Sequence, residues 1–252
     1  MFGEYFLKKV FGRTKSLKDA HTHYCGGCGH GIAHRILCEV IDELNIREKT
    51  IGIAPVGCAV LGYDYWNFDV CEAAHGRTPA VATGIKRARP DSIVFSYQGD
   101  GDLAAIGTAE IVHAANRGEN ITVIFVNNTV YGMTGGQMAP TTLVNQTTLT
   151  TPQGRSYEEY GAPLKICELL SQLSGVAYAI RVSLHAPTEI IKAKKAIQKA
   201  FQTQIDKQGF SIVEIVSQCP TYWGLDPIRS IDYVKDVLLP YFSLGVYKDK
   251  TK

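Results

Sequence analysis

The sequence predicts an α/β fold with a mostly parallel β-sheet and helices on both of its faces. The first observation is a β-α-β unit at residues 93–132, where a buried strand at 93–97 leads through a Gly-Asp-Gly turn at 99–101 into a helix. The helix ends before Gly118, and a second apolar strand at 121–126 ends in two asparagines. The second observation is that other apolar runs of strand length are separated by helical patterns. The third is that polar residues follow the strand ends, and in open α/β sheets this edge binds ligands.

Composition and charge are those of an ordinary globular chain. With 252 residues, 45% apolar and 20% charged, the chain can bury a full core. We expect a single domain over 1–252, because no Pro/Ser-rich linker or charge block divides it. Residues 1–20 and 221–252 are expected to be terminal extensions. A formal charge of +2 gives no reason to expect nucleic acid or membrane partners.

The expected location is the cytoplasm. The first twenty residues lack the continuous apolar core of a secretory signal, and no later stretch approaches the ~20 apolar residues of a membrane span. In a reducing compartment, metal binding or burial is a better explanation than disulfides for the seven cysteines.

The N-terminal half supplies a loop, two helices and a strand. The loop at 21–31 is rich in glycine and cysteine, and a helix with one apolar face follows from Ile32. A short strand is expected at 51–54. Residues 63–78 are aromatic and then polar, without a clear period, and a helix of small residues is expected at 79–87.

The segment 129–161 has no hydrophobic period and is rich in Gly, Thr and Gln. Aperiodic segments of this length inside a compact domain are usually functional or disordered, and this one has too little charge for a typical disordered tract. We interpret it as a lid over a cofactor and an interface with another chain.

The C-terminal part completes the sheet. A helix is expected at 163–173, a strand at 176–182, a helix at 187–204, a buried strand at 210–216, and a terminal helix at 231–242 that a proline interrupts. The helix at 187–204 has a lysine-rich face, which we expect to be solvated: Lys192, Lys194, Lys195 and Lys199.

The Gly-Asp-Gly turn and the paired asparagines have the chemistry of a metal-bridged phosphate site. Gly99 and Gly101 let the backbone approach a diphosphate closely. The Asp100 carboxylate and the Asn128 amide oxygen are hard ligands of the kind that Mg²⁺ takes beside substrate phosphates. Twenty-five residues separate the turn from the asparagine pair, a spacing that fits the thiamine-diphosphate signature.

A His75-Gly76-Arg77 triplet stands immediately before the helix at 79–87. A histidine and an arginine next to a helix start can bind an anionic group. A solvated loop or a helix cap explains the same residues, and the sequence leaves both interpretations open.

Four of the cysteines are candidates for one metal centre. Cys25 and Cys28 form a C-x-x-C among glycines, and Cys58 and Cys219 each follow a predicted strand at the edge that carries the phosphate site. Four thiolates suit a zinc ion or an iron–sulfur cluster, and geometry does not choose between them. A redox cluster beside an organic cofactor has a purpose that zinc would lack. The other cysteines are expected to be structural: Cys38, Cys71 and Cys167.

Taken together, these motifs resemble the β subunits of the 2-oxoacid:ferredoxin oxidoreductases, and most of all the branched-chain 2-oxoisovalerate group. The resemblance runs from about His23 to Pro220. It rests on several motifs in the same order: Cys25 to His30, Val56-Gly57-Cys58, His75-Gly76-Arg77, Tyr97 to Asp102, Asn127-Asn128 and Tyr131 to Thr142.

The resemblance implies a thiamine-diphosphate-binding fold, a [4Fe–4S] cluster on the four candidate cysteines, and Mg²⁺ on Asp100, Asn128 and the Val130 carbonyl. It implies catalytic roles for His75 and Arg77. The residues expected to bind the cofactor are Gly57, Cys58, His75, Gly76, Gly99, Asp100, Gly101, Asp102, Asn128, Val130, Tyr131, Gly132, Met133 and Thr134.

The resemblance also implies other subunits: a pyrimidine-side α subunit, a γ subunit and a ferredoxin-like δ subunit. The chain shows one diphosphate grip and no second α/β half to present the acid that activates thiamine, so we expect that acid on a partner. The implied reaction is coenzyme A-dependent oxidative decarboxylation of a 2-oxoacid, with electrons passing to ferredoxin.

The substrate is expected to be 2-oxoisovalerate or another branched 2-oxoacid, because Ala59, Val60 and Leu61 follow Cys58 and include no cation. These three residues could equally be core. A 2-oxoglutarate-specific member, a non-oxidative thiamine decarboxylase or synthase, and a zinc-stapled binding subunit stay as alternatives.

Overall fold

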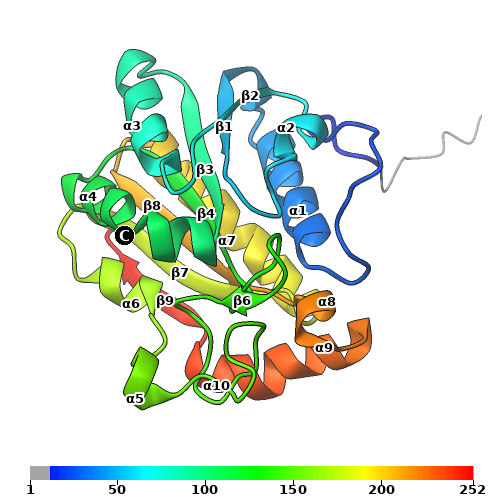
Figure 1. Cartoon of the computed structure of the whole chain (residues 1–252). Helices are drawn as coiled ribbons and strands as arrows, with labels where there is room; N and C mark the ends of the chain where they lie inside the picture. The colour runs from blue at the N-terminus through cyan, green and yellow to red at the C-terminus, as the bar shows by residue number, and fades with distance from the viewer. Residues whose placement is uncertain (1–11, 252) are drawn as a thin grey trace, which may run out of the picture.

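A sheet of seven strands forms the centre of the protein (Figure 1). The computed structural model describes residues 12–251, so part of the expected N-terminal extension (1–11) and the last residue lie outside the described residues. In chain order the strands are β1 (Thr50–Ala54), β2 (Asp69–Glu72), β3 (Ile93–Gly99), β4 (Thr122–Asn127), β7 (Val176–Ser183), β8 (Phe210–Val216) and β9 (Gly245–Asp249). Their order in the sheet is β2-β1-β3-β4-β8-β7-β9. All neighbours are parallel except β7 and β9, so the predicted mostly parallel sheet is confirmed.

Helices cover both faces of this sheet, as predicted. The helices that pack on the sheet are α1 (His30–Glu43), α3 (Thr78–Ala88), α4 (Thr108–Arg117), α6 (Ile166–Ser171) and α7 (Pro187–Ile205). One core, built around Trp66, Phe95 and Phe201, packs α1 and α7 on one face. A second core packs α3, α4 and α6 on the other face, where Phe125 and Phe210 are fully buried. Because both faces are covered, β3 and β4 are buried along almost their whole length, which explains their continuous apolar runs.

The strand ends gather the candidate site. In β2, β1, β3, β4 and β8, five neighbours in the sheet, the parallel pairing brings all the carboxyl ends to one edge. Just beyond these ends lie His75, Cys58, Asp100, Asn128 and Cys219, in the same order. Residues that are far apart in the chain are therefore neighbours along one edge.

The segment 129–161 is ordered around a buried arginine. It contains a two-stranded hairpin, β5 (Val130–Tyr131) with β6 (Gln137–Met138), and a short helix α5 (Tyr157–Tyr160). Arg155 is 4% exposed, and within residues 12–251 its guanidinium donates hydrogen bonds to six backbone carbonyls: Ala139, Pro140, Thr142, Tyr160, Gly161 and Ala162. One cation thus holds the two arms of the segment together.

The C-terminal residues pack against this segment (Figure 1). After β8 come α8 (Pro220–Trp223), α9 (Pro227–Tyr233), a π-helical turn η3 (Val234–Leu238) and α10 (Leu239–Tyr241). Val234, Leu238 and Phe242 form a third small core with Leu143 of the loop. The terminal helical region therefore begins at Pro227, with Asp226 as its N-cap, earlier than the predicted 231.

Several predicted boundaries were wrong for identifiable reasons. The helix after the Gly-Asp-Gly turn begins already at Gly101, inside the predicted turn at 99–101, as a π-helical turn η2 (Gly101–Ile106). Strands β2 and β9 were missed because they lie at the edges of the sheet, where half-exposed residues give no apolar run. Two lysines of α7 are less solvated than expected, because Lys194 pairs with Glu39 and Glu43 of α1, and Lys199 pairs with Asp249 of β9.

Short helices join the main elements: α2 (Gly62–Tyr65) and a 3₁₀ turn η1 (Arg47–Lys49).

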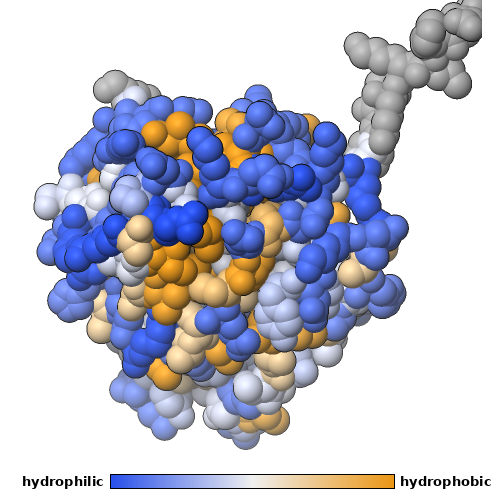
Figure 2. All heavy atoms as spheres, turned by 90° about the horizontal axis from the view of Figure 1, so that it is seen from above, coloured by the Kyte–Doolittle hydropathy of each residue, from blue (hydrophilic) through white to orange (hydrophobic). Residues whose placement is uncertain are grey.

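Within residues 12–251, no helix combines the length and the hydropathy needed to cross a bilayer. Figure 2 shows one face of the molecule, where hydrophobic atoms gather toward the middle and hydrophilic side chains surround them.

Candidate cofactor site

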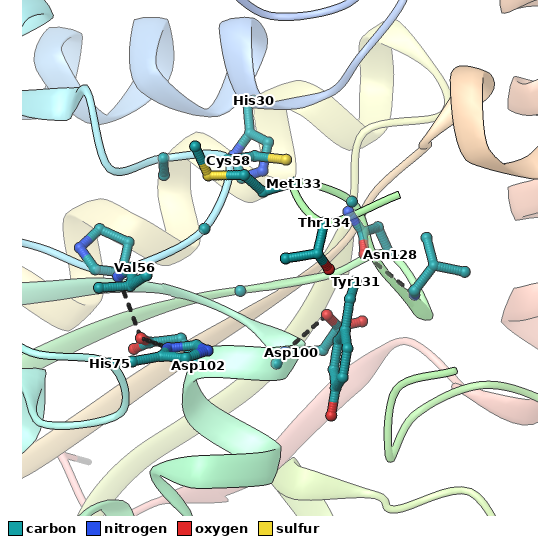
Figure 3. Close-up of a pocket in the computed structure, with 17 residues that line it drawn as sticks. His30, Val56, Cys58, His75, Asp100, Asp102, Asn128, Tyr131, Met133 and Thr134 are labelled. Carbon is teal, nitrogen blue, oxygen red and sulfur yellow. Dashed lines mark hydrogen bonds and ion pairs between the residues drawn. The ribbon is translucent and has the colours of Figure 1, made fainter. Parts of the chain in front are cut away.

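A pocket at the carboxyl edge of the sheet brings most of the predicted cofactor residues together (Figure 3). Of the predicted set, its wall contains Gly57, Cys58, His75, Gly99, Asp100, Gly101, Asp102, Asn128, Val130, Tyr131, Gly132, Met133 and Thr134. Ala59, expected near the substrate, also lines it, and three further lining residues had no predicted role: His30, Pro55 and Val56. In Figure 3, His30, Cys58 and Met133 lie at one end of the pocket, away from Asp100 and Tyr131.

Three oxygen groups converge in this pocket. The side-chain amide of Asn128 lies 3.2 Å from Asp100 Oδ2 and 2.8 Å from the carbonyl oxygen of Val130. When the amide oxygen faces these two acceptors, no hydrogen-bond donor stands between the three oxygens; when the amide turns over, its nitrogen donates to both. An octahedral Mg²⁺ with bonds of about 2.0–2.1 Å sets adjacent ligand oxygens about 2.9 Å apart. The donor set and its spacing therefore fit Mg²⁺.

The Asp100 carboxylate is almost fully buried. It accepts hydrogen bonds from the backbone N–H of Gly101 (2.9 Å) and the hydroxyl of Thr141 (2.9 Å). No cationic side chain pairs with it in the described part of the chain, and burial raises the pKa of Asp100 to about 7. A divalent cation would favour the ionised carboxylate. Thr141 was not predicted, because a threonine in an aperiodic loop carries no sequence signal for this contact.

Asp102, predicted to bind the cofactor, lines the pocket, and its carboxylate accepts hydrogen bonds from protein donors. Its Oδ1 accepts from His75 Nδ1 (2.6 Å) and from the backbone N–H groups of Gly76 (2.8 Å) and Val56 (3.2 Å). Its Oδ2 accepts from Gln98 Nε2 (2.7 Å). Since the Asp102 carboxylate accepts the hydrogen bond from Nδ1–H of His75, the Nε2 of this half-exposed ring faces the pocket without that partner.

The two residues after His75, Gly76 and Arg77, have different surroundings in the structure. Gly76 has φ 77°, and a Cβ there would come within 2.7 Å of Gly107 N, so no other residue fits. Arg77 does not line the pocket. Its half-exposed guanidinium pairs with Glu110 of α4, and its catalytic role stays a prediction.

The four candidate cysteines line one second cavity, together with His30, Asn128 and residues 220–222. Burial raises the pKa of Cys28, and it raises the pKa of Cys58 and of Cys219 to about 12, so these thiols need a metal to stabilise their thiolates. In the described residues no three His, Cys, Asp or Glu side chains converge tightly enough for a single metal ion. A [4Fe–4S] cluster binds each cysteine to a different iron and so tolerates wider spacing than one zinc ion does. Cys38 and Cys167 are buried, as predicted, and Cys71 is half-buried on β2.

The two cavities share a wall. His30, Cys58 and Asn128 line both of them. Gly132 lies close to this wall and leaves little room for a side chain, because a Cβ there would lie 3.0 Å from the Cys58 sulfur and 3.8 Å from the Cys219 sulfur. His30 is fixed by a hydrogen bond of 2.8 Å between its Nδ1 and the Tyr97 hydroxyl, and burial lowers its pKa to about 4, so the ring is neutral.

This fold, with a Gly-Asp-Gly turn and a paired asparagine at neighbouring strand ends, defines a thiamine-diphosphate-binding domain. Residues 56–215 match the family described as thiamine pyrophosphate enzyme, C-terminal TPP binding domain. The ketoisovalerate oxidoreductase subunit VorA of Methanothermobacter thermautotrophicus is 48% identical over 97% of this chain and 51% of that protein. The 2-oxoglutarate synthase subunit KorB of Methanocaldococcus jannaschii is 41% identical over 80% of this chain and 70% of that protein.

A solved structure agrees with these relatives. The 2-oxoglutarate:ferredoxin oxidoreductase from Magnetococcus marinus, with 2-oxoglutarate, coenzyme A and succinyl-CoA bound, superposes with a TM-score of 0.78 at 26% identity. The match covers 94% of this chain and 84% of that one. The chain therefore belongs to the thiamine-diphosphate-binding subunits of the 2-oxoacid oxidoreductases, which confirms the predicted family. It spans about half the length of the VorA relatives that it matches.

Proposed function

We propose that this chain is the cofactor-holding β subunit of a multi-subunit 2-oxoacid:ferredoxin oxidoreductase. One observation carries the proposal: the pocket with the converging oxygens of Asp100, Asn128 and Val130 shares a wall with the cavity lined by four cysteines. A non-oxidative thiamine enzyme would use the first cavity and have no use for the second. A zinc-stapled binding subunit would have no use for the first.

Each cofactor has residues of suitable chemistry. Asp100, Asn128 and the Val130 carbonyl would hold Mg²⁺, with the diphosphate against the backbone of Gly99 and Gly101. A [4Fe–4S] cluster would take the four candidate cysteines: Cys25, Cys28, Cys58 and Cys219. When bound, thiamine diphosphate supplies the carbanion that a 2-oxoacid carbonyl needs in order to lose CO₂.

The chain's own residues would bind, orient and move protons. Asp102 fixes His75 so that Nε2 can hold or release a proton in the pocket. Cys58, Gly132 and His30 keep the wall between the two cavities thin and free of charge, which suits electron transfer across it. The acid that activates the aminopyrimidine would come from the α subunit, since the described residues present no second α/β half.

The reaction balances as follows. The bond between the carboxylate and the keto carbon of the 2-oxoacid breaks and releases CO₂, and a thioester forms with coenzyme A, whose thiol gives up its proton. The electron pair that is left would go to ferredoxin one electron at a time, and the four candidate cysteines would hold the cluster that supplies such single-electron transfer. We place the complex in the cytoplasm, where thiols stay reduced for cluster assembly, with γ and ferredoxin-like δ subunits as further partners.

Cofactor analysis of the complex purified without oxygen tests this function. We expect bound thiamine diphosphate, magnesium, iron and acid-labile sulfide, together with 2-oxoacid- and coenzyme A-dependent reduction of ferredoxin. Zinc in place of iron would refute the redox role, and iron without thiamine diphosphate would refute the catalytic one.

A further inference from the structure

The turn between the predicted metal ligands has an unusual backbone conformation. Thr129 lies between Asn128 and Val130 and has φ 62°, in the left-handed region that β-branched residues rarely adopt. This turn lets the Asn128 amide approach both the Val130 carbonyl and Asp100. A relaxed, extended backbone at Thr129 would take the Asn128 side chain and the Val130 carbonyl apart, so the surrounding structure must hold the turn.

Part of the restraint comes from the segment 129–161 and from β4. The Thr142 hydroxyl donates to the Thr129 carbonyl (2.5 Å), and Gln146 Nε2 donates to the Thr129 hydroxyl (2.8 Å). The Thr129 N–H donates to the side-chain oxygen of Asn127 (3.3 Å). Thr129 is itself fully buried, so water cannot replace these partners.

The remaining restraint comes from the far end of the chain. The indole N–H of Trp223 donates a hydrogen bond of 3.1 Å to the backbone carbonyl of Asn128. Trp223 closes the short helix α8, which begins directly after Cys219, and its ring lies 4.8 Å from that of Tyr233. The carbonyl that it binds belongs to the peptide that leads into Thr129. Without this bond the peptide would keep the hydrogen bonds at Thr129 but lose the restraint on its carbonyl, so it could rotate more easily toward a relaxed φ.

We propose that Trp223 is a positioning residue for the metal–diphosphate site. It holds the Asn128–Thr129 peptide so that the Asn128 amide and the Val130 carbonyl stay beside Asp100 before any ligand arrives. The inference rests on the proposed function, because it assigns Trp223 to the binding of Mg²⁺ and thiamine diphosphate at that site. The same short helix follows the last candidate cluster ligand, so the C-terminal residues would brace both halves of the site.

The test replaces Trp223 by phenylalanine, which keeps an aromatic ring but removes the N–H donor together with part of the indole ring. Thiamine diphosphate binding to the anaerobically purified complex is measured by calorimetry over a range of Mg²⁺ concentrations. We expect Trp223→Phe to need about fivefold more Mg²⁺ for half-saturation, the equivalent of one hydrogen bond of about 1 kcal/mol. Excess Mg²⁺ should restore full occupancy, because the ligands themselves are intact. The matched control is Tyr233→Phe, which removes a hydroxyl from the same small core without touching the turn.

Each possible outcome either supports or overturns the proposal. An unchanged Mg²⁺ dependence in Trp223→Phe would overturn the proposal. A loss of thiamine diphosphate binding that excess Mg²⁺ does not restore would also overturn it, if the melting temperature falls or the cluster spectrum weakens at the same time. That pattern would describe a merely structural residue. If the unaltered complex shows no Mg²⁺-dependent binding of thiamine diphosphate, the proposed function fails, and this inference fails with it.

Discussion

Replacing Asp102 by alanine is the most direct test of how the site is held together. The Asp102 carboxylate is 1% exposed and accepts four hydrogen bonds, from Val56, His75, Gly76 and Gln98. In the alanine variant the half-exposed His75 ring can turn to water. The N–H of Gly76 and the amide of Gln98 are buried and cannot.

The expected size of the effect follows from those donors. A buried donor left without a partner costs about 1–3 kcal/mol, so Asp102→Ala should lower the free energy of unfolding by about 3 kcal/mol or more. For a chain of this size, 1 kcal/mol changes the melting temperature by about 2–4 °C, which predicts a fall of about 10 °C. Asp102→Asn should cost only about 1 kcal/mol, because its oxygen keeps the bonds to Gly76 and Val56 while the Gln98 amide turns over to accept from the new nitrogen.

Thermal melting followed by circular dichroism measures both variants. Glu48→Gln serves as the control, because its pair with Arg47 is exposed and exposed pairs contribute about 0–1 kcal/mol. If Asp102→Ala melts within about 2 °C of the unaltered protein, the four hydrogen bonds do not organise the site as argued.

Three further predictions concern the cofactors. Asp100→Ala or Asn128→Ala should lose bound thiamine diphosphate at low Mg²⁺ while the cluster absorbance is unchanged; full occupancy in either variant would remove that residue from the metal site. Serine at any candidate cluster ligand should bleach the protein and stop ferredoxin reduction: Cys25, Cys28, Cys58 and Cys219. Serine at the other cysteines should cost only modest stability and leave the visible spectrum intact: Cys38, Cys71 and Cys167. Expressed alone, the chain should bind thiamine diphosphate weakly and show no turnover, and complete 2-oxoacid oxidation by the isolated chain would contradict this.

The sequence located the centre of the fold because central parallel strands leave a strong pattern. β3 and β8 are buried along almost their whole length, and their mainly apolar sequences, ending in Gly99 or followed by Ser217, mark strand and edge together. Edge strands such as β9 have one open side and leave no such pattern. The π-helical turn at Gly101 could not be predicted either, because the extra residue in this turn leaves no recognisable side-chain period in the sequence.

The same contrast holds within the site. Residues that meet a ligand at strand ends, such as Asp100 and Asn128, belong to local motifs with a fixed spacing. The residues that hold Asp100 and Asn128 in place do not belong to such motifs. Thr141 donates a hydrogen bond to Asp100 from a loop, and Trp223 donates one to Asn128 although the two residues are 95 positions apart in the sequence. Such contacts depend on tertiary packing alone, so only the structure shows them.

The pocket chemistry bears on the substrate. Ala59 lines the cofactor pocket and is 2% exposed, whereas Val60 and Leu61 are half-buried beside it. Among the described residues, no lysine or arginine lines the pocket, and burial keeps His30 neutral by lowering its pKa. A second carboxylate, as in 2-oxoglutarate, would therefore be buried with no lysine or arginine of the described residues beside it, which is costly.

We expect a branched aliphatic tail to fit this wall better. Each added methylene in a fitting apolar pocket contributes about 1–3 kcal/mol to transition-state binding, so 2-oxoisovalerate should exceed pyruvate in kcat/KM by about tenfold or more. It should exceed 2-oxoglutarate as well, because the second carboxylate loses its hydration without gaining a partner. The measurement is kcat/KM for the three acids in the assembled complex, with coenzyme A as acyl acceptor and ferredoxin as oxidant. A higher value for 2-oxoglutarate would mean that Arg77 or another subunit brings a cation to the tail, and that the apolar wall after Cys58 does not select the substrate.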